Sequence, residues 1–265
     1  MQFQDILYTL DRGVARITLN KPEKLNALSW GSWAEIENAI AMAEQDDSAR
    51  CVVIAGSGRG FCAGTDLTSA TRESDWPARP FPGRSGQMRS RYLGTAQVHH
   101  CRKPTIAAVN GACVGAGFSL AMACDIRIAS EAARFSAIFV KRAIVADTGC
   151  TWFLPRLVGT ENALKMMYTG KIIDAGEALG IGLVSEVVPA DALEERVTGL
   201  AREIAAGPSV AIELMKRLTH EGMTRGLDEQ IEMEQFLQGI THNTEDSAEG
   251  RQSFLEKREP QFKGR

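Results

Sequence analysis

The stretch Pro104–Asp125, PTIAAVNGACVGAGFSLAMACD, decides how the rest of the chain is interpreted. It begins with an apolar β-type run, Thr105–Val109, which Asn110 and Gly111 interrupt. Two more glycines then precede a second apolar run, Phe118–Cys124. The length of the stretch would suit a membrane span, but the glycines divide it into two elements. We therefore predict a buried strand followed by a buried helix.

A strand that enters a helix through a glycine-rich turn leaves backbone N–H groups bare at the helix N-terminus. Such donors suit negative charge, either on a phosphate or on an oxygen that becomes anionic during a reaction. The stretch alone does not decide between these two uses. The remaining sequence has to show which kind of ligand the turn would face.

Composition limits the class of protein. The chain has 265 residues, enough for one large α/β domain or for a core domain with a small appendage. Its net charge of −3 gives no reason to expect nucleic-acid or membrane-surface binding. The six cysteines form no C-x-x-C pair and no metal-finger spacing, so we expect buried, reduced thiols and no metal site. The first residues, MQFQDILYTL, lack the pattern of a signal peptide, and we therefore expect a cytoplasmic protein.

Apolar periodicity predicts the first elements of the chain. Ile6–Leu10 and Val14–Leu19 alternate apolar and polar residues around a turn, which indicates a β-hairpin. Ser29 is suited to cap a helix whose apolar residues recur at helical spacing as far as Ala43. Cys51–Ala55 is short and wholly apolar, which is typical of an interior parallel strand.

Later segments shift from strands to helices. Residues 68–103 begin as a Pro-containing irregular loop, and Ser85–Arg102 favours a helix. A strand is expected at Ile126–Ala129. The helices expected near the C-terminus are 191–206, 208–221, 227–240 and 244–257, the last capped by Thr244. We therefore predict an α/β core of ββα units over residues 1–190 and an all-helical region over residues 191–265.

Two local patterns resemble functional motifs but lack their context. The glycines of Gly56–Gly60 follow a strand, but the third is one place early for a dinucleotide-binding turn, and no acidic residue ends a strand about 20 residues later. Ser119 echoes a nucleophile elbow, yet it lies inside a helical run rather than on the turn after a strand. We interpret Ser119 as a helix serine that is hydrogen-bonded within the fold.

Six motifs follow one another along nearly the whole chain. They are Asn20-x-Pro22-x3-Asn26-Ala27-Leu28, Arg59–Leu67 (RGFCAGTDL), Lys103-Pro104-x5-Asn110-Gly111-x3-Gly115-Ala116-Gly117, Cys124–Ala129 (CDIRIA), Leu154–Gly159 (LPRLVG) and Gly182-Leu183-Val184. In this order the motifs resemble the enoyl-CoA hydratase/isomerase (crotonase) family. The resemblance implies a crotonase-like α/β spiral of ββα repeats with a C-terminal α-helical region, assembled as a homotrimer or a dimer of trimers.

The resemblance assigns an oxyanion hole to two backbone amides. The first is the N–H of Thr65, and the second is the N–H of Ala116, at a position where the family commonly has glycine. One such donor contributes about 3 kcal/mol to the stability of a developing oxyanion. Two N–H groups directed at one thioester oxygen would therefore stabilise an enolate and ease removal of a proton next to the carbonyl.

Two positions depart from the hydratases of the family, which carry one glutamate in the central helix and one in the following loop. The matching residues here are Ser119 and Phe139, so water addition by paired carboxylates is not supported. Asp147 stands in an apolar segment and is either a helix N-cap or a functional carboxylate. The isomerases of the family have an aspartate in the matching segment. Burial there would raise its pKa and suit it to take and return a proton.

The resemblance also implies residues that bind an acyl-CoA thioester. The positions it assigns to substrate or CoA are Lys24, Ala27, Ala63, Gly64, Asp66, Leu67, Phe139, Phe262 and Lys263. Phe262 and Lys263 would reach the nucleotide across a subunit interface. A solvated surface is the alternative explanation for Lys24 and Lys263. No tightly bound cofactor is expected, since CoA arrives with the substrate.

The whole pattern is most similar to the phenylacetate-pathway isomerases of the family, which rearrange a ring-epoxide CoA thioester and shift enoyl-CoA double bonds. The resulting hypothesis is an acyl-CoA isomerase with Asp147 as the single acid and base. A hydratase or hydrolase in which Asp147 activates water is the alternative. Aroyl-CoA dehalogenases fit less well, because they have a tryptophan where Phe139 stands. The acidic residues between Glu229 and Glu249 argue against an RNA-binding relative.

Overall fold

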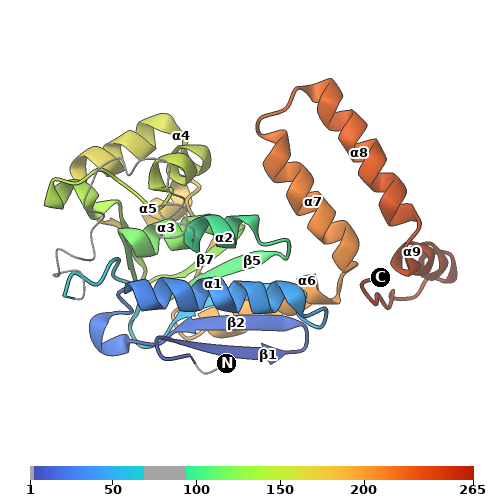
Figure 1. The fold of residues 1–265 in the computed structure, drawn as a ribbon, viewed down its shortest axis with the longest axis horizontal. Coiled ribbons are helices and arrows are strands. Elements are labelled where there is room, and N and C mark those ends of the chain that lie inside the picture. The colour runs from blue at the N-terminus through green and yellow to red at the C-terminus, as the bar shows by residue number, and fades with distance from the viewer. Residues whose placement is uncertain (1–2, 69–93) are drawn as a thin grey trace, which may run out of the picture.

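The computed structural model describes residues 3–68 and 94–265. Within these residues the strands form two sheets, and helices pack on both faces of the larger one (Figure 1). The larger sheet has six strands in the order β1-β2-β3-β5-β7-β10. Their bounds are β1 Ile6–Asp11, β2 Val14–Leu19, β3 Cys51–Gly56, β5 Thr105–Val109, β7 Ile126–Ser130 and β10 Glu186–Val188.

Strand pairing in this sheet agrees with the apolar pattern of the sequence. β1 and β2 form the predicted antiparallel hairpin, whereas β2, β3, β5, β7 and β10 run parallel. Every residue of β5, and every residue of β3 before Gly56, is buried. A parallel strand that is covered on both faces needs apolar side chains on both. The prediction of an interior parallel strand at Cys51–Ala55 is therefore confirmed.

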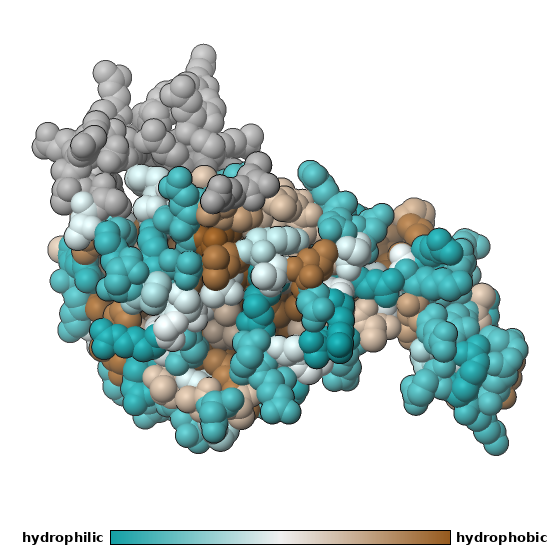
Figure 2. All heavy atoms as spheres, turned by 90° about the horizontal axis from the view of Figure 1, so that it is seen from below, coloured by the Kyte–Doolittle hydropathy of each residue, from teal (hydrophilic) through white to brown (hydrophobic). Residues whose placement is uncertain are grey.

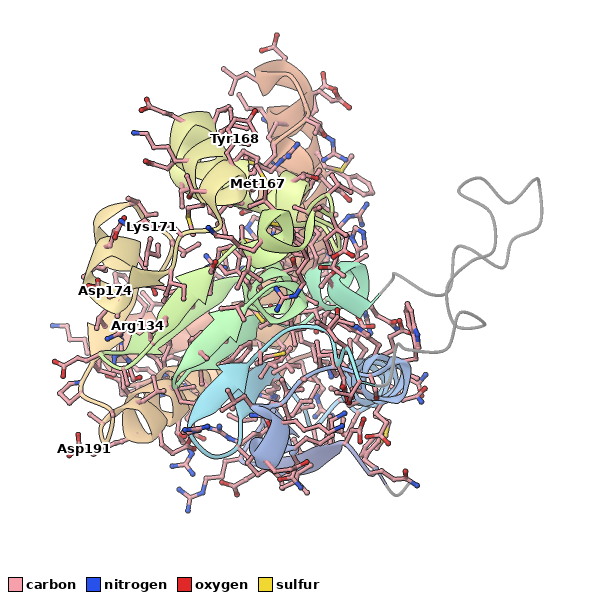
Figure 3. The ribbon with its side chains drawn as sticks, turned by 90° about the vertical axis from the view of Figure 1, so that its left-hand side faces the viewer. Arg134, Met167, Tyr168, Lys171, Asp174 and Asp191 are labelled. Atoms are coloured by element: carbon pink, nitrogen blue, oxygen red, sulfur yellow. The ribbon has the colours of Figure 1, made fainter. Side chains whose placement is uncertain are left out.

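The smaller sheet contains short strands that continue those of the larger one. Its members, in order, are β4 Gly60–Cys62, β6 Ala112–Val114, β8 Arg134–Ser136 and β9 Ile173–Asp174. β4, β6 and β8 follow β3, β5 and β7 along the chain, and the next element among the described residues is a helix or a 3-10 turn in each case. These ββα units form the predicted spiral. At the edge seen in Figure 3, Arg134 of β8 lies opposite Asp174 of β9.

The described helices are α1 Trp30–Gln45, α2 Gly94–His100, α3 Ala116–Ala123, α4 Cys150–Thr169, α5 Ala175–Gly180, α6 Leu193–Ala206, α7 Ser209–Gly222, α8 Leu227–His242 and α9 Glu245–Glu256, with the 3-10 turns η1 Pro22–Lys24 and η4 Ile138–Arg142. The helices α1, α3 and α6–α9 begin within two residues of their predicted positions, whereas the sequence did not predict the start of α4 or of α5. Ser29 caps α1 and Thr244 caps α9, as predicted. The helix predicted over 85–102 ends at His100, and residues 85–93 of that prediction lie outside the described residues.

Alternate residues of the central strands face two different apolar layers. Val52 and Ile54 of β3 point into the larger cluster, which includes residues of α1, α3 and α4. Cys51 and Val53 point to the opposite face, where α6 packs with Val197 and its other buried residues. This separation follows from the two-residue period of a β-strand. The sheet therefore has one apolar layer on each face.

The C-terminal helices differ in how they attach to this body. α6 packs on the sheet, while α7 and α8 form an antiparallel pair beside it, and α9 lies at the far end of that pair (Figure 1). No residue of α7 is buried. Seen from below, the end of the molecule that carries α9 forms a separate lobe whose visible face is largely hydrophilic (Figure 2). The division of the chain at residue 190 stays a prediction, although α6 packs with the core.

Two further properties concern the described residues as a whole. Among them, no helix combines the length and the apolar character that a membrane crossing requires. All six cysteines lie in the described part of the chain, and each is a buried free thiol. Burial raises the pKa of the thiols, for example to about 12 for Cys62 and Cys150, so these groups stay protonated at neutral pH.

Candidate active site

Two glycine turns from separate ββα units meet at the start of α3. Gly64 follows β4 and has a φ of +94°, and Gly115 follows β6 and has a φ of +56°, both in the region that favours glycine. A Cβ atom added to Gly64 would lie 3.0 Å from the carbonyl oxygen of Val114 and 3.5 Å from the amide nitrogen of Ala116. The two turns are therefore in direct backbone contact, which a side chain on Gly64 would prevent.

The amides of Thr65 and Ala116, which directly follow these glycines, differ from their neighbours in hydrogen bonding. The neighbouring N–H of Gly115 donates to the carbonyl oxygen of Ser136, and that of Asp66 donates to the carbonyl oxygen of Leu28. In contrast, neither the N–H of Thr65 nor that of Ala116 donates to an acceptor among residues 3–68 and 94–265. Thr65 is exposed, whereas Ala116 is buried and is the first residue of α3. Within the described residues both amides are therefore donors without an acceptor, and their role in an oxyanion hole stays a prediction.

The first loop of the chain holds the first glycine turn in place. The N–H of Ala63 donates to the carbonyl of Leu25 at 2.9 Å, and the N–H of Leu28 donates to that of Gly64 at 2.7 Å. Asn26 is buried and donates through Nδ2 to the carbonyl oxygens of Ser57 and Gly60, at 2.9 and 2.8 Å. Six predicted CoA-binding positions are thereby gathered on adjoining loops: Lys24, Ala27, Ala63, Gly64, Asp66 and Leu67.

An ion pair joins these two loops. Nζ of Lys24 lies 2.9 Å from Oδ2 of Asp66, whose side chain is 6% exposed compared with 46% for Lys24. Hydrogen bonds from Thr68 and Lys24 hold the pKa of the Asp66 carboxyl well below its ordinary value, despite burial. The ammonium group of Lys24 is therefore half-exposed beside the turn that leads to Thr65, and it carries a fixed positive charge there.

Asp147 lies in the irregular segment between η4 and α4. Gly149 is the N-cap of α4 and no side chain caps that helix, so the alternative that Asp147 serves as its cap is excluded. Asp147 is exposed, and Oδ1 accepts a 3.3 Å hydrogen bond from the hydroxyl of Thr148. The protein around the carboxyl group nevertheless removes part of its water, which raises its pKa above the ordinary value. Its surroundings thus favour proton uptake.

Ser119 connects this segment to the second glycine turn. Its side chain is fully buried in α3, and Oγ lies 3.5 Å from the carbonyl oxygen of Gly115 and 3.4 Å from that of Asp147. A Cβ atom on Gly115 would also lie 3.7 Å from the side chain of Ile138, next to the buried Phe139. The residues predicted for catalysis therefore lie around one end of α3.

Helix α2 supports the same segment from another side. The hydroxyl of Thr95 donates to the carbonyl oxygen of Thr148 at 2.9 Å. Further along α2, the ring of His99 packs edge-on against Trp152 and Phe153 at the start of α4, with centroid distances of 5.0 and 5.3 Å. Asp147 is thus held between α2, α3 and α4, although its carboxyl group reaches the surface.

Known proteins of similar sequence and structure indicate the family in which such a site occurs. The family model described as enoyl-CoA hydratase/isomerase matches residues 9–265. The chain belongs to this family. The 1,2-epoxyphenylacetyl-CoA isomerase of Escherichia coli is 36% identical over 98% of both chains, and the crotonyl-CoA hydratase of Syntrophomonas wolfei is 36% identical over 99% of both. A solved structure of an enoyl-CoA hydratase from Bacillus anthracis has a TM-score of 0.90 at 33% identity, covering 99% of this chain and 100% of that one.

Membership of the enoyl-CoA hydratase/isomerase family confirms the fold class that the motifs predicted, and with it the general class of enzyme. The relatives include proteins named as isomerases and proteins named as hydratases. Membership of the family is therefore compatible with either reaction, and only the residues of this chain can distinguish isomerisation from hydration.

Phe262 and Lys263 lie apart from the other predicted site residues of this member of the enoyl-CoA hydratase/isomerase family. Their carbonyl oxygens accept hydrogen bonds from the guanidinium of Arg50, which directly precedes β3. The first glycine turn follows the opposite end of β3, and a strand of this length spans roughly 20 Å. In one chain, therefore, the C-terminal residues do not join the loops around Gly64.

Sequence reasoning missed three supporting residues. Asn26 appeared as part of a motif, but its buried amide is what fastens the first loop to residues 57–60. Ser119 was interpreted as a helix serine, which its contact with Gly115 confirms, yet its second contact is with Asp147. Thr95 carried no signal at all. In each case the partner is distant in sequence, so no local pattern identifies it.

Proposed function

We propose that this protein is an acyl-CoA isomerase that moves a carbon–carbon double bond along the acyl chain. The observation that carries the proposal is the location of Asp147, whose main chain shares the Ser119 hydroxyl with the glycine turn before Ala116. A carboxyl group with a raised pKa suits a reaction in which one residue first takes a proton and later returns it.

The reaction begins at the carbon between the thioester carbonyl and the double bond of a 3-enoyl-CoA. The ionised carboxylate of Asp147 removes a proton from this carbon, and the electron pair moves towards the carbonyl oxygen to form a dienolate. The amides of Thr65 and Ala116 donate to that oxygen, each contributing about 3 kcal/mol. Protonated Asp147 then gives the proton to the carbon two positions further along. The product is a 2-enoyl-CoA, and the carboxylate is regenerated.

A hydratase or hydrolase is the second candidate. The exposure of Asp147 favours it, because an exposed carboxylate can also activate water. The residues at the two glutamate positions of the family's hydratases argue against hydration, since Ser119 and the buried Phe139 offer no second carboxylate. An isomerisation needs no second acid, whereas water addition by the paired mechanism does.

The substrate in this proposal is a CoA thioester. Lys24 would contribute positive charge for the CoA phosphates, and the backbone of Ala63–Leu67 would line the path of the pantetheine. Phe262 and Lys263 would serve the site of a second copy of the chain, because in their own chain they lie beside Arg50. This requires an oligomer, which the family resemblance implies is a homotrimer or a dimer of trimers and whose mass sedimentation measures.

Product analysis tests the proposal. The enzyme is incubated separately with a 3-enoyl-CoA and with a 2-enoyl-CoA, and the products are identified by mass spectrometry and chromatography. An isomerase converts the 3-enoyl-CoA to the 2-enoyl isomer without a change of mass. A gain of one water from the 2-enoyl-CoA, or release of free CoA, would establish the second candidate instead. The Asp147→Asn variant should abolish whichever of these activities the wild type has.

A further inference from the structure

Ser119 lies where the two parts of the proposed catalytic site meet. It is fully buried, and its backbone N–H donates to the carbonyl oxygen of Gly115 at 3.1 Å, closing the first turn of α3. Its hydroxyl lies 3.5 Å from the same oxygen and 3.4 Å from the carbonyl oxygen of Asp147. Both distances exceed that of an ordinary O–H···O hydrogen bond, so the hydroxyl makes one weak contact on each side of the site.

The contact of Ser119 with the carbonyl of Gly115 affects the backbone amide of Ala116. The carbonyl of Gly115 and the N–H of Ala116 belong to the same peptide unit, so hydrogen bonds accepted by the carbonyl polarise the N–H at the other end. Gly115 also holds a positive φ, which orients this peptide unit. The backbone N–H of Ser119, at 3.1 Å, therefore holds this peptide unit and polarises the Ala116 amide, and the hydroxyl adds a weaker contact to the same carbonyl.

The contact of Ser119 with the carbonyl of Asp147 affects the irregular segment before α4. Residues 144–147 have no regular secondary structure, and the following residue, Thr148, has a φ of +49°. The carbonyl oxygen of Asp147 accepts a 2.9 Å hydrogen bond from the N–H of Cys150, besides the contact with Ser119. Ser119 is thus the link through which α3 restrains the backbone of Asp147.

We propose that Ser119 is a positioning residue that sets the placement of the Asp147 carboxyl relative to the Ala116 amide. The inference rests on the proposed function, because it assigns to both partners the roles given above. Ser119 itself does not touch substrate in this account. It acts by keeping the base at a fixed distance from the carbon next to the thioester carbonyl, and a small displacement of a reacting group is costly in rate.

The experiment compares Ser119→Ala and Ser119→Cys with a matched control, Ser253→Ala. Ser253 is also a buried helix serine, and its hydroxyl donates to the carbonyl of Gly250, but it lies in α9. Two quantities are measured: steady-state kinetics with the substrate that the wild type converts, and solvent-deuterium exchange at the carbon next to the thioester carbonyl of an acyl-CoA. Amide hydrogen exchange of residues 143–150, measured without substrate, is the third readout.

The expected result is a fall in kcat of about tenfold for Ser119→Ala, with KM within about twofold and α-proton exchange reduced in parallel, equivalent to about 1.4 kcal/mol of transition-state stabilisation. Ser119→Cys, with a weaker donor of similar shape, should lie between Ala and wild type. Segment 143–150 should exchange faster in Ser119→Ala and be unchanged in Ser253→Ala.

Unchanged kcat and unchanged exchange of 143–150 in Ser119→Ala would overturn the inference. So would an equal loss in Ser253→Ala, because a general effect of helix stability would then be sufficient. If the wild type hydrates its substrate instead of isomerising it, the proposed function fails. In that case, faster exchange of residues 143–150 would still support the positioning role, and unchanged exchange there would reject it. The two failures are thus distinguishable.

Discussion

The backbone of Gly64 lies against the amide of Ala116, so closely that a Cβ atom on Gly64 would sit 3.5 Å from that nitrogen. The two residues come from different ββα units and are separated by more than 50 positions in the sequence. Their contact places the amide of Thr65, which follows Gly64, beside the N-terminus of α3. The parallel pairing of β4 with β6 produces this contact, since both turns leave the sheet at the same edge.

Substitution of Gly64 by alanine should therefore damage the site more than the fold. The added methyl group would meet the carbonyl of Val114 at 3.0 Å, and a φ of +94° is strained for any residue with a Cβ atom. We expect kcat/KM to fall by at least a hundredfold, as loss of an oxyanion donor does in other enzymes. Gly180→Ala is the control, because a Cβ atom there meets nothing within 4 Å. Equal activity of the two variants would contradict this view of the turn.

Asp147→Asn should remove turnover while leaving CoA affinity near normal. Acid–base catalysis by one residue is worth about 10²–10⁴-fold, and asparagine neither takes nor returns a proton. Isothermal calorimetry with a non-reacting acyl-CoA measures affinity, and product formation measures turnover.

The raised pKa of Asp147 also predicts how the activity of the wild type depends on pH. Since the base must be ionised, kcat/KM should rise with pH through an apparent pKa above the usual aspartate value.

Lys24→Ala should weaken substrate binding without changing the chemical step. The ammonium group pairs with Asp66 at 2.9 Å, but it is half-exposed, so its contribution to the stability of the fold is small. We expect KM for the CoA substrate to rise several-fold, more strongly at low salt, with kcat unchanged. Lys165→Ala removes a comparable exposed pair with Glu161 and serves as the control. If both variants keep the wild-type KM, Lys24 belongs to a solvated surface only.

Most of the fold could be predicted because apolar periodicity reports burial directly. Cys51–Ala55 and Thr105–Val109 are apolar throughout, and both are interior parallel strands. The extent of the helical region was harder to predict, since α6 resembles the later helices in sequence. Only the structure shows Val197 packing on the sheet, whereas α7 has no buried residue.

The site was harder to predict than the fold, because part of it consists of backbone groups. An amide donor has no side-chain signature, so Thr65 and Ala116 were assigned through family motifs rather than from their own chemistry. Side chains that act across long sequence distances were equally hidden. Ser119 is 28 residues from Asp147, and Asn26 is more than 30 residues from both carbonyls that it binds. Asp147, the proposed acid and base, was visible in the sequence because a carboxylate in an apolar segment is uncommon.

Asn26→Asp should destabilise the protein although it changes a single atom. Nδ2 donates to the carbonyl oxygens of Ser57 and Gly60, and a carboxylate oxygen in its place would face two acceptors in a site that is 1% exposed. We expect a loss of about 3 kcal/mol or more in the free energy of unfolding, measured in urea. Asn162→Asp, at a half-buried position on α4 with one such bond, should cost about 1 kcal/mol at most. Equal costs would show that the first loop tolerates the charge.

His99 joins α7 to the start of α4, and its titration should make that contact sensitive to acid. Its ring stacks on His220 of α7 with a centroid distance of 4.2 Å, and Oδ1 of Asp125 lies 3.3 Å from Nε2 of His220. The same carboxyl group binds Lys216 at 2.8 Å. Burial, together with the neighbouring His220, lowers the pKa of His99 from 6.5 to about 4. A neutral His99 is therefore part of the native packing around Trp152.

The sign of the effect follows from the two pKa values of His99. Between pH 6.5 and about 4 the unfolded chain binds a proton at this residue while the folded chain does not, so stability falls as the pH is lowered. His99→Phe keeps an aromatic ring in the stack but cannot titrate. We expect the melting temperature of this variant to fall less than that of the wild type between pH 7 and pH 5. His242→Phe, at an exposed position in α8, should follow the wild type. Parallel curves for all three proteins would mean that other groups, such as Asp125, govern the acid limit of the fold.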